Sequence, residues 1–222
     1  MGDDKVFEFI LCYYSRMMTQ KYDLKKASTY LQKKDPVLGK IIEKVPPLQR
    51  EAEGSNYFLD LVESIVGQQL SVKAADTIWG RLINLSDNGD LTAKAILQIP
   101  DEKIRAAGIS WSKIKYIKDL ATKTIESPDM FEHFDTMSDE EIIDVLTKVK
   151  GIGRWTAEMF LMFAMGRPDI FSYGDLGLKN AIKKLYSLKE MPTEKQANKI
   201  AEKWKPYRTV ACRYLWKSLE LK

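Results

Sequence analysis

A short glycine turn between two helical patterns constrains this chain more than any other feature. Residues 148–150 close the first pattern, Gly151-Ile152-Gly153 form the turn, and the second pattern begins at Arg154. The two glycines permit backbone angles that other residues resist, and they leave no side chain in the way of a ligand. A helix that begins at such a turn exposes backbone N–H groups, which can receive a phosphate without reading a base sequence. The sequence therefore predicts two helices that meet at a phosphate-binding hairpin.

The same turn has a simpler interpretation, in which a glycine cap merely joins two packed helices. Two observations favour a ligand site. Lys150 and Arg154 add positive charge on either side of the turn, and one carboxylate, Asp175, follows Gly153 by 22 residues. Between them, residues 156–165 are apolar on nearly every side, which predicts a buried central helix. Such a helix would fix the hairpin and Asp175 relative to each other.

Asp175 itself allows two roles. It precedes residues 176–182, whose pattern predicts another helix, and an aspartate in this position commonly caps a helix N-terminus. A cap can also face a cleft. There, a carboxylate stabilises a developing oxocarbenium ion on a sugar and orients a water molecule against it. Cleavage of a bond between a sugar and a base normally needs a second, acidic carboxyl group that protonates the leaving base. A leaving base that already carries a positive charge has little need of this proton.

Apolar residues recur at helical spacing along most of the chain. Four such stripes are Phe58-Leu61-Val62-Ile65, Ile114-Ile117-Ala121-Ile125, Ile142-Leu146-Val149 and Ala197-Ile200-Ala201-Trp204. Ser138 with Glu141, and Thr193 with Gln196, fit the capping box that starts a helix. The pattern predicts about ten helices with short connections, and therefore an all-α fold. The apolar run at residues 6–11 fits either a helix or a strand.

Composition limits the classes of function. The 222 residues carry a formal net charge of +4, a mild basic bias that is compatible with nucleic acid. No apolar run approaches the roughly 18 residues of a membrane span, and the acidic N-terminus does not resemble a signal peptide. With Cys12 and Cys212 as the only cysteines, this chain alone cannot supply a four-cysteine zinc or iron–sulfur site. We therefore expect no metal site and no required cofactor.

Four stretches, taken in order, resemble the helix–hairpin–helix superfamily of DNA glycosylases, and most closely its 3-methyladenine DNA glycosylase II family. They are residues 66–75 (VGQQLSVKAA), 150–157 (KGIGRWTA), 171–181 (FSYGDLGLKNA) and 204–216 (WKPYRTVACRYLW). The resemblance implies an all-α fold of two helical lobes with a DNA-binding cleft between them, containing a helix–hairpin–helix motif. Lobe one would comprise about residues 1–57 plus 172–222, and lobe two about 58–171, with the hairpin at 148–157.

The resemblance also implies an activity. It indicates a monofunctional DNA glycosylase of base excision repair, which flips an alkylated purine such as 3-methyladenine or 7-methylguanine out of duplex DNA. Hydrolysis of the glycosidic bond would leave an abasic site, and Asp175 falls on the family's essential aspartate. Relatives that also cut the strand carry a nucleophilic lysine two residues after the second hairpin glycine. Here that position is Trp155, and an indole cannot form a Schiff base.

Further site residues follow from the same resemblance. The hairpin residues expected to grip the DNA backbone are Gly151, Ile152, Gly153, Arg154 and Thr156, and their carbonyls would hold a monovalent cation, as in many members. Trp155, Met159 and Trp216 fall on the base pocket, where an indole face attracts a cationic base. The alternative for Trp155 and Trp216 is that both are core tryptophans, and the alternative for Met159 is that it fills the core. Many members have proline where this chain has Ser172.

Two more segments are candidates for DNA contact. Either Gln69 or Leu70, followed by Ser71, matches the loop that fills the hole left by a flipped base. Ser110 and Lys113 would touch the opposite side of the backbone, although an ordinary helix cap explains the same residues.

Two other functions stay open. One is a glycosylase for neutral lesions such as hypoxanthine, ethenoadenine or uracil, which leave poorly without an acid; no obvious acid stands beside Asp175 in the sequence. The other is a non-catalytic DNA-binding helix–hairpin–helix module. In each case we expect a monomer that binds double-stranded DNA and no membrane. It would be cytoplasmic and associated with the nucleoid, or nuclear in a eukaryotic host.

Overall fold

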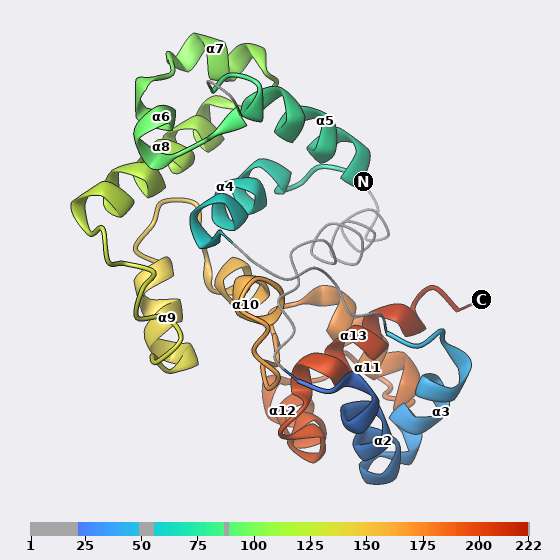
Figure 1. Ribbon diagram of the computed structural model, residues 1–222. Helices are drawn as coiled ribbons and strands as arrows, with labels where there is room; N and C mark the ends of the chain where they lie inside the picture. The colour runs from blue at the N-terminus through green and yellow to red at the C-terminus, as the bar shows by residue number, and fades with distance from the viewer. Residues whose placement is uncertain (1–21, 49–55, 87–88, 222) are drawn as a thin grey trace.

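The computed structural model describes residues 22–48, 56–86 and 89–221, and every regular element in these ranges is a helix (Figure 1). The prediction of an all-α fold is confirmed, whereas the run at residues 6–11 lies outside the described residues. The elements are α2 (Leu24–Lys34), α3 (Pro36–Lys44), α4 (Tyr57–Gly67), α5 (Val72–Ile83), α6 (Ala93–Gln98), α7 (Asp101–Ala106), α8 (Trp111–Glu126), α9 (Asp139–Leu146), α10 (Arg154–Phe163), α11 (Leu176–Leu185), α12 (Glu194–Ala201), the 3-10 helix η3 (Glu202–Trp204) and α13 (Arg208–Ser218).

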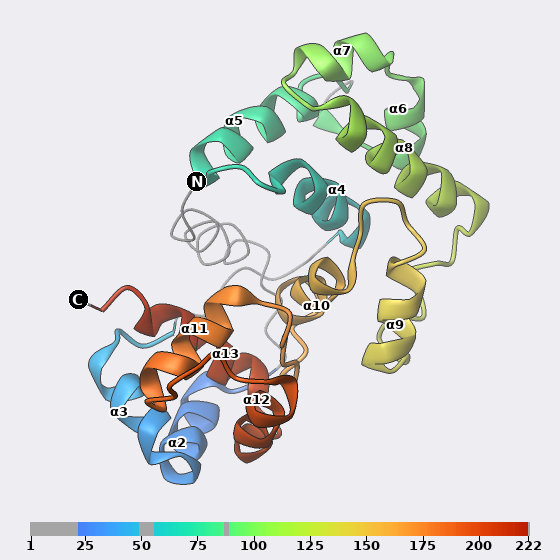
Figure 2. The same ribbon diagram turned by 180° about the vertical axis from the view of Figure 1, so that it is seen from behind.

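The helices gather in two groups, which both views of the ribbon show (Figures 1 and 2). In one group, α13 packs against α2, α3 and α11. In the other, α4 packs against α5 and α8, and α8 also packs against α6 and α7. The central helix α10 contacts α4 and α9, so the helices on either side of the hairpin turn belong with the second group. The predicted lobe boundaries near residues 57 and 171 remain an interpretation of this packing.

The apolar stripes place nearly all of their residues in the core, and both predicted capping boxes form, at Ser138 and at Thr193. Ile200 is only partly buried, and Ile125 is exposed. It lies in the last turn of α8 and is 46% exposed. The expectation that it would be buried was wrong, because periodicity marks one face of a helix without showing where the neighbouring helices end.

Two helices that are buried on nearly all sides form the centre of the fold. In α10, every residue from Thr156 to Phe163 is buried, as the apolar run 156–165 predicts. In α13, the buried residues run from Thr209 to Trp216 without a break. The indole of Trp216 stacks on Phe163, with ring centroids 6.0 Å apart. This contact joins α13 to the C-terminal end of α10. The two helices that carry residues of the candidate site are therefore packed directly against each other.

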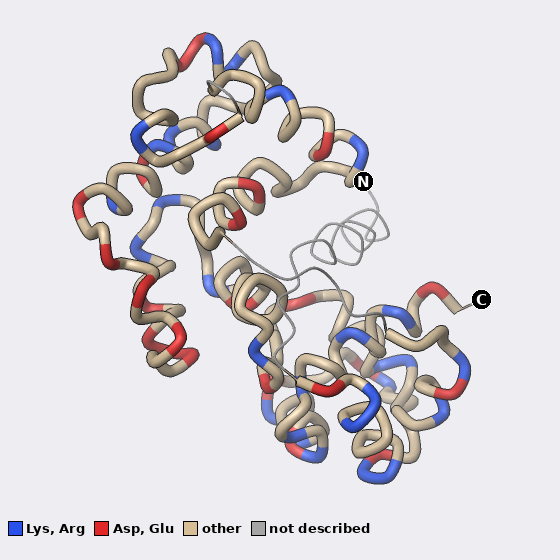
Figure 3. Tube along the Cα trace, viewed as in Figure 1, with Lys and Arg blue, Asp and Glu red and all other residues tan. Residues whose placement is uncertain are grey.

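Charge is unevenly distributed over the molecule (Figure 3). Acidic residues gather on α9, whose first turn carries Asp139, Glu140 and Glu141, while Lys and Arg are spread widely over α2, α3, α11 and α12. A polyanion would therefore be repelled by the exposed face of α9 and would approach the hairpin from its turn. Within the described ranges, none of the helices combines the length and the hydropathy needed to cross a lipid bilayer.

Candidate active site

Asp175 caps the N-terminus of α11 and is 4% exposed. Its Oδ1 accepts the backbone N–H of Leu178 at 2.8 Å and the indole N–H of Trp216 at 2.9 Å. Its Oδ2 accepts the indole N–H of Trp155 at 2.9 Å. Both indoles come from the central helices, Trp155 from the first turn of α10 and Trp216 from α13. The predicted cap is therefore present, and two tryptophans far away in the sequence hold the same carboxylate.

Among the described residues, the hydrogen bonds leave one acceptor position of this carboxylate unused. Each carboxylate oxygen can accept about two hydrogen bonds. Oδ1 of Asp175 accepts two among the described residues, whereas Oδ2 accepts only one. Three N–H donors and the N-terminus of α11 complement a negative charge and fix its position. A carboxylate held in this way can orient a water molecule or stabilise an adjacent cation without rearranging.

The three candidates for the base pocket differ in their exposure. Trp155 is half-buried, whereas Met159 and Trp216 have no exposed surface. Met159 lies one turn after Trp155 on α10, on the same face of that helix. In this conformation only Trp155 presents any surface to a ligand. A pocket role for Met159 or Trp216 stays a prediction, and it requires side-chain movement.

The glycine turn has the geometry that the sequence predicts. Gly151 has a φ of +81°, and a Cβ built on it would lie 2.1 Å from the ring of Tyr116, so only glycine fits. Gly153 is the N-cap of α10, where a Cβ would meet nothing within 4 Å, and no described side chain caps this helix. Its first backbone N–H groups are thus available to an anion.

The predicted DNA-binding residues of the hairpin do not all face outward. Gly151, Gly153 and Arg154 are exposed, whereas the side chains of Ile152 and Thr156 are buried. Only the backbones of these last two residues could reach a phosphate. Arg154 is exposed but not free, because its guanidinium pairs with the carboxylates of Glu140 and Glu158.

The loop at residues 68–71, between α4 and α5, lies against the hairpin, and we call it the wedge loop. The side-chain amide of Gln68 donates to the carbonyl of Gly151 at 2.9 Å. Gln69, with a φ of +60°, is exposed, while Leu70 packs partly against the core and Ser71 caps α5. Of the two predicted wedge residues, Gln69 is therefore the one at the tip of the loop.

Lys113 takes a role that the sequence did not predict. Its ammonium group donates to the carbonyls of Val66 and Gln68, at 2.8 and 2.6 Å, and so supports the wedge loop from beneath. Burial lowers the pKa of Lys113. Ser110 caps α8 and accepts the backbone N–H of Lys113, as in the simpler interpretation of this segment. Contact of either residue with DNA stays a prediction, and the geometry of the lysine does not favour it.

Sequence reasoning missed Glu158, which lies on α10 one turn after Arg154. Its carboxylate accepts the hydroxyl of Ser172 at 2.5 Å and Nε of Arg154 at 3.0 Å. Burial raises the pKa of Glu158, and the hydrogen bonds from Ser172 and Arg154 offset part of that effect. The sequence does contain a signal for it, because Glu158 is a single charged residue inside the apolar run 156–165. A buried charge needs hydrogen-bond or ion-pair partners, so its position predicts that such partners exist.

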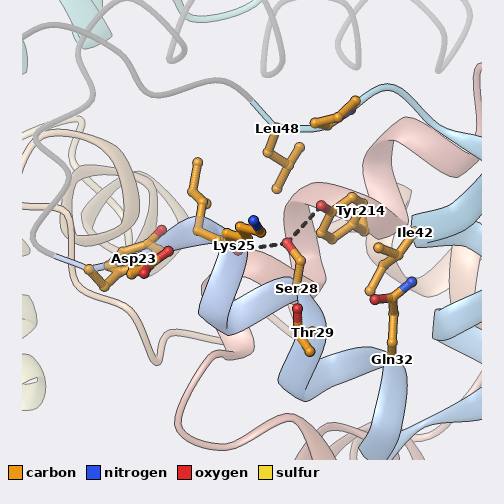
Figure 4. Close-up of a pocket in the computed structure, with 11 residues that line it drawn as sticks. Asp23, Lys25, Ser28, Thr29, Gln32, Ile42, Leu48 and Tyr214 are labelled. Atoms are coloured by element: carbon orange, nitrogen blue, oxygen red, sulfur yellow. Dashed lines mark hydrogen bonds between the residues drawn. The ribbon is translucent and has the colours of Figure 1, made fainter.

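Two cavities differ in their relation to Asp175, because one is lined by its neighbours Trp155 and Gly174 and the other is remote from it. One, of about 430 Å³, is formed between α9, α10, α12 and residues 169–174, and Arg154, Trp155 and Glu158 line part of it. The other, of about 900 Å³, lies between α2 and α13, where Ser28 and Tyr214 share a hydrogen bond of 2.8 Å (Figure 4). The larger cavity contains no residue of the hairpin, the wedge loop or the Asp175 cap, so it is not part of the candidate site.

Comparison with known proteins identifies the class to which this fold and site belong. The model of the HhH-GPD superfamily base excision DNA repair proteins matches residues 62–206, which include the wedge loop, the hairpin and Asp175. The chain belongs to this family.

Particular relatives share most of the chain. It is 38% identical to DNA-3-methyladenine glycosylase 1 of Schizosaccharomyces pombe over 78% of its own length and 76% of the relative's. It is 33% identical to the alkylbase DNA glycosidase-like protein mag2 of the same organism, over 90% of this chain and 95% of that one. The structure of an S. pombe 3-methyladenine DNA glycosylase in complex with abasic DNA superposes with a TM-score of 0.77 and 34% identity, covering 88% of this chain and 97% of that chain.

Proposed function

We propose that this protein is a monofunctional DNA glycosylase, which removes alkylated purines such as 3-methyladenine and 7-methylguanine from double-stranded DNA. One observation carries the proposal: Asp175 is fixed by two indole N–H groups and a helix N-terminus, and its Oδ2 accepts only one hydrogen bond among the described residues. The relatives named as 3-methyladenine glycosylases, and the solved complex with abasic DNA, support the substrate class. The protein would act on DNA as a monomer, in the cytoplasm or the nucleus.

The first step is to grip and open the duplex. The N–H groups at the start of α10, beside Gly153, would receive a backbone phosphate, and the exposed Gln69 would fill the hole left by the flipped nucleotide. The carbonyl of Gly151 accepts one hydrogen bond, from Gln68, and a carbonyl oxygen has a second lone pair. We propose that a monovalent cation binds the hairpin carbonyls, of which Gly151 has this lone pair to offer, and neutralises phosphate charge there.

The chemical step breaks the bond between the sugar C1′ and the base nitrogen. The bonding electron pair leaves with the base and neutralises its positive charge, while Asp175 stabilises the oxocarbenium ion that forms. The oxygen of a water molecule then bonds to C1′, and its proton passes to Asp175 and on to solvent. Neutral purines have no positive charge to neutralise, so they would leave far more slowly.

Trp155 would give the enzyme two of its properties. The electron-rich face of an indole attracts a cationic base more strongly than a neutral one. The same residue stands where strand-cutting relatives carry their lysine, and an indole cannot form the covalent imine that strand cleavage requires. We therefore propose that the product is an abasic site in an intact strand.

The experiment that tests the proposal measures free base released from methylated duplex DNA, by the wild type and by Asp175→Asn. We expect 3-methyladenine or 7-methylguanine from the wild type only, with strand breaks appearing after alkali and no protein trapped on DNA by borohydride. A folded wild-type protein that binds DNA but releases no methylated base would overturn the proposal. Duplexes containing hypoxanthine, ethenoadenine or uracil, assayed beside it, would then separate a neutral-lesion glycosylase from a silent binding module.

A further inference from the structure

A single carboxylate links the hairpin to the segment that carries Asp175. Glu158 lies in the second turn of α10, and its Oε1 accepts Nε of Arg154, the first residue of that helix. Its Oε2 accepts the hydroxyl of Ser172, which lies on the chain leading to α11. The side chain of Glu158 is only 9% exposed. Both of its oxygens are therefore used, one toward each part of the site.

Ser172 connects Glu158 to the proposed catalytic residue Asp175 through a second hydrogen bond. Its carbonyl accepts the backbone N–H of Asp175 at 3.1 Å, which closes the turn before α11. The hydroxyl and the carbonyl of one residue thus connect Glu158 to the backbone of Asp175. At the other end of the turn, the indole of Trp155 holds the Asp175 side chain. Helix α10 consequently grips this turn at two points, through Glu158 and through Trp155.

A buried carboxylate is a costly way to join two segments. A buried charge loses its hydration, and the partners of Glu158 repay only part of that loss, since burial still raises its pKa. Its neighbours in sequence on α10, Ala157 and Met159, are buried with apolar side chains, which carry no such cost. A purely structural position would therefore be filled more stably by an apolar side chain of similar volume.

We infer that Glu158 is a positioning residue, which holds the turn from Ser172 to Asp175 in a fixed place relative to the hairpin. This inference rests on the proposed function. DNA bound at the start of α10 fixes the target sugar, so the position of Asp175 relative to α10 decides whether its free Oδ2 direction meets C1′. A displacement of about 1 Å in such an arrangement costs on the order of a hundredfold in rate.

The exposed partner of Arg154 supplies a matched control. Glu140, on α9, pairs with the outer nitrogens of the same guanidinium, and both members of this pair are more than half exposed. Exposed pairs contribute little. Glu140→Gln therefore removes one partner of Arg154 and leaves the link from Glu158 to Ser172 in place, whereas Ser172→Ala breaks that link by removing one hydroxyl.

The test measures two quantities, the single-turnover rate of methylated-base release and the Kd for a duplex containing an abasic site. We expect Ser172→Ala and Glu158→Ala to lower the rate by about 10- to 100-fold, while Kd changes by less than about twofold. Glu158→Gln should recover most of the rate, because its amide can accept from Arg154 and donate to the Ser172 hydroxyl. Glu140→Gln should leave the rate unchanged, and it should keep or slightly lower Kd, because it removes a negative charge beside the hairpin.

A second readout does not depend on activity. Hydrogen exchange of the Asp175 amide, followed in a peptide covering residues 171–181, should accelerate in Ser172→Ala and Glu158→Ala but not in Glu140→Gln. Wild-type rate and wild-type exchange in Ser172→Ala, the mildest variant, would overturn the inference. So would a loss of rate matched by an equal loss of DNA binding. The two claims can also fail separately. If the wild type releases no base but the Asp175 amide still exchanges faster in Ser172→Ala and Glu158→Ala, the proposed function is wrong, while the connection from Glu158 through Ser172 to Asp175 is supported.

Discussion

Two aspartates, Asp35 and Asp175, cap helices in the same manner, but their carboxylates accept different numbers of hydrogen bonds. Each is the N-cap of its helix, α3 or α11, each is buried, and each accepts an indole N–H. The carboxylate of Asp35 accepts four hydrogen bonds, from the backbone of Val37 at 3.0 Å, the backbone of Leu38 at 3.3 Å, the Tyr186 hydroxyl at 2.6 Å and the Trp204 indole at 3.1 Å. The carboxylate of Asp175 accepts three among the described residues.

The difference of one hydrogen bond agrees with a structural role for Asp35 and with the catalytic role that we propose for Asp175. Four donors fill the lone-pair positions of Asp35, so it has no capacity left for a ligand. Among the described residues, Oδ2 of Asp175 accepts one hydrogen bond and keeps one acceptor position. The helix cap, the burial and the tryptophan partner are common to both, and none of them identifies a catalytic carboxylate. We propose that the unused acceptor position on Oδ2 distinguishes the two, and the following variants test this distinction.

The largest effect is expected from Asp175→Asn. We expect the single-turnover rate of methylated-base release to fall by about a thousandfold, because the neutral amide cannot stabilise a sugar cation. The same substitution at Asp35 should leave the rate per folded molecule unchanged. Rates would be measured on the fraction of protein that binds an abasic-site duplex. Equal losses of rate in the two variants would show that the comparison does not separate their roles.

The second effect concerns stability and should be larger at Asp35. In Asp35→Asn, an amide group replaces one carboxylate oxygen and cannot accept the buried Trp204 indole N–H. Leaving such a donor unsatisfied costs about 1–3 kcal/mol. We expect a free energy of unfolding lower by that amount in urea titrations, with base release retained. An inactive Asp35→Asn protein with wild-type stability would contradict this assignment.

A third and smaller effect separates the two indoles. Trp155→Phe removes the only described donor to Oδ2 of Asp175, so the carboxylate should lose orientation and the rate should fall about tenfold. Trp204→Phe removes the matching donor to Asp35 and should lower the stability without changing the rate of base release. Single-turnover rates and urea midpoints of both variants provide the test. A slow but stable Trp204→Phe protein would reverse the comparison.

Local patterns in the sequence predicted most of this arrangement. The capping boxes, the buried central helix and the glycine turn each depend on neighbouring residues, and the structure bears them out. The aspartate at the start of α11 was also predicted as a cap. Its two indole partners lie 20 and 41 residues away, and only the resemblance to a known family placed them near it.

What the sequence did not predict depends on tertiary contacts. The support of the wedge loop by Lys113 spans 45 residues, and the link between Glu158 and Ser172 joins a helix to a loop. From composition and periodicity alone, a lysine on a helix is predicted to be exposed to solvent. The contact of the Lys113 ammonium group with two backbone carbonyls could therefore not be predicted. Asp35 shows the same limit, because nothing local distinguishes its saturated carboxylate from that of Asp175.

The smallest effect comes from a donor that only Asp35 has. Burial raises the pKa of the Tyr186 hydroxyl, and its hydrogen bond to the charged Asp35 raises it further. The hydroxyl therefore keeps its proton in the folded protein above pH 10, where the tyrosine of the unfolded chain loses it. Because the unfolded state then binds fewer protons, the stability from this group is complete below about pH 10. Above that pH it falls by about 1.4 kcal/mol per unit.

Tyr186→Phe should accordingly reduce the free energy of unfolding by about 1–2 kcal/mol at pH 8, since it removes a hydrogen bond to a charged group. The difference from the wild type should shrink as the pH rises above 10, because the variant lacks the proton that the wild type must release on unfolding. Urea titrations at pH 8, 9.5 and 10.5 measure it. The indole donors of Asp175 do not titrate, so Trp155→Phe should show a difference that is independent of pH. A constant gap for Tyr186→Phe across this range would show that the pKa of its hydroxyl is not raised in the folded protein.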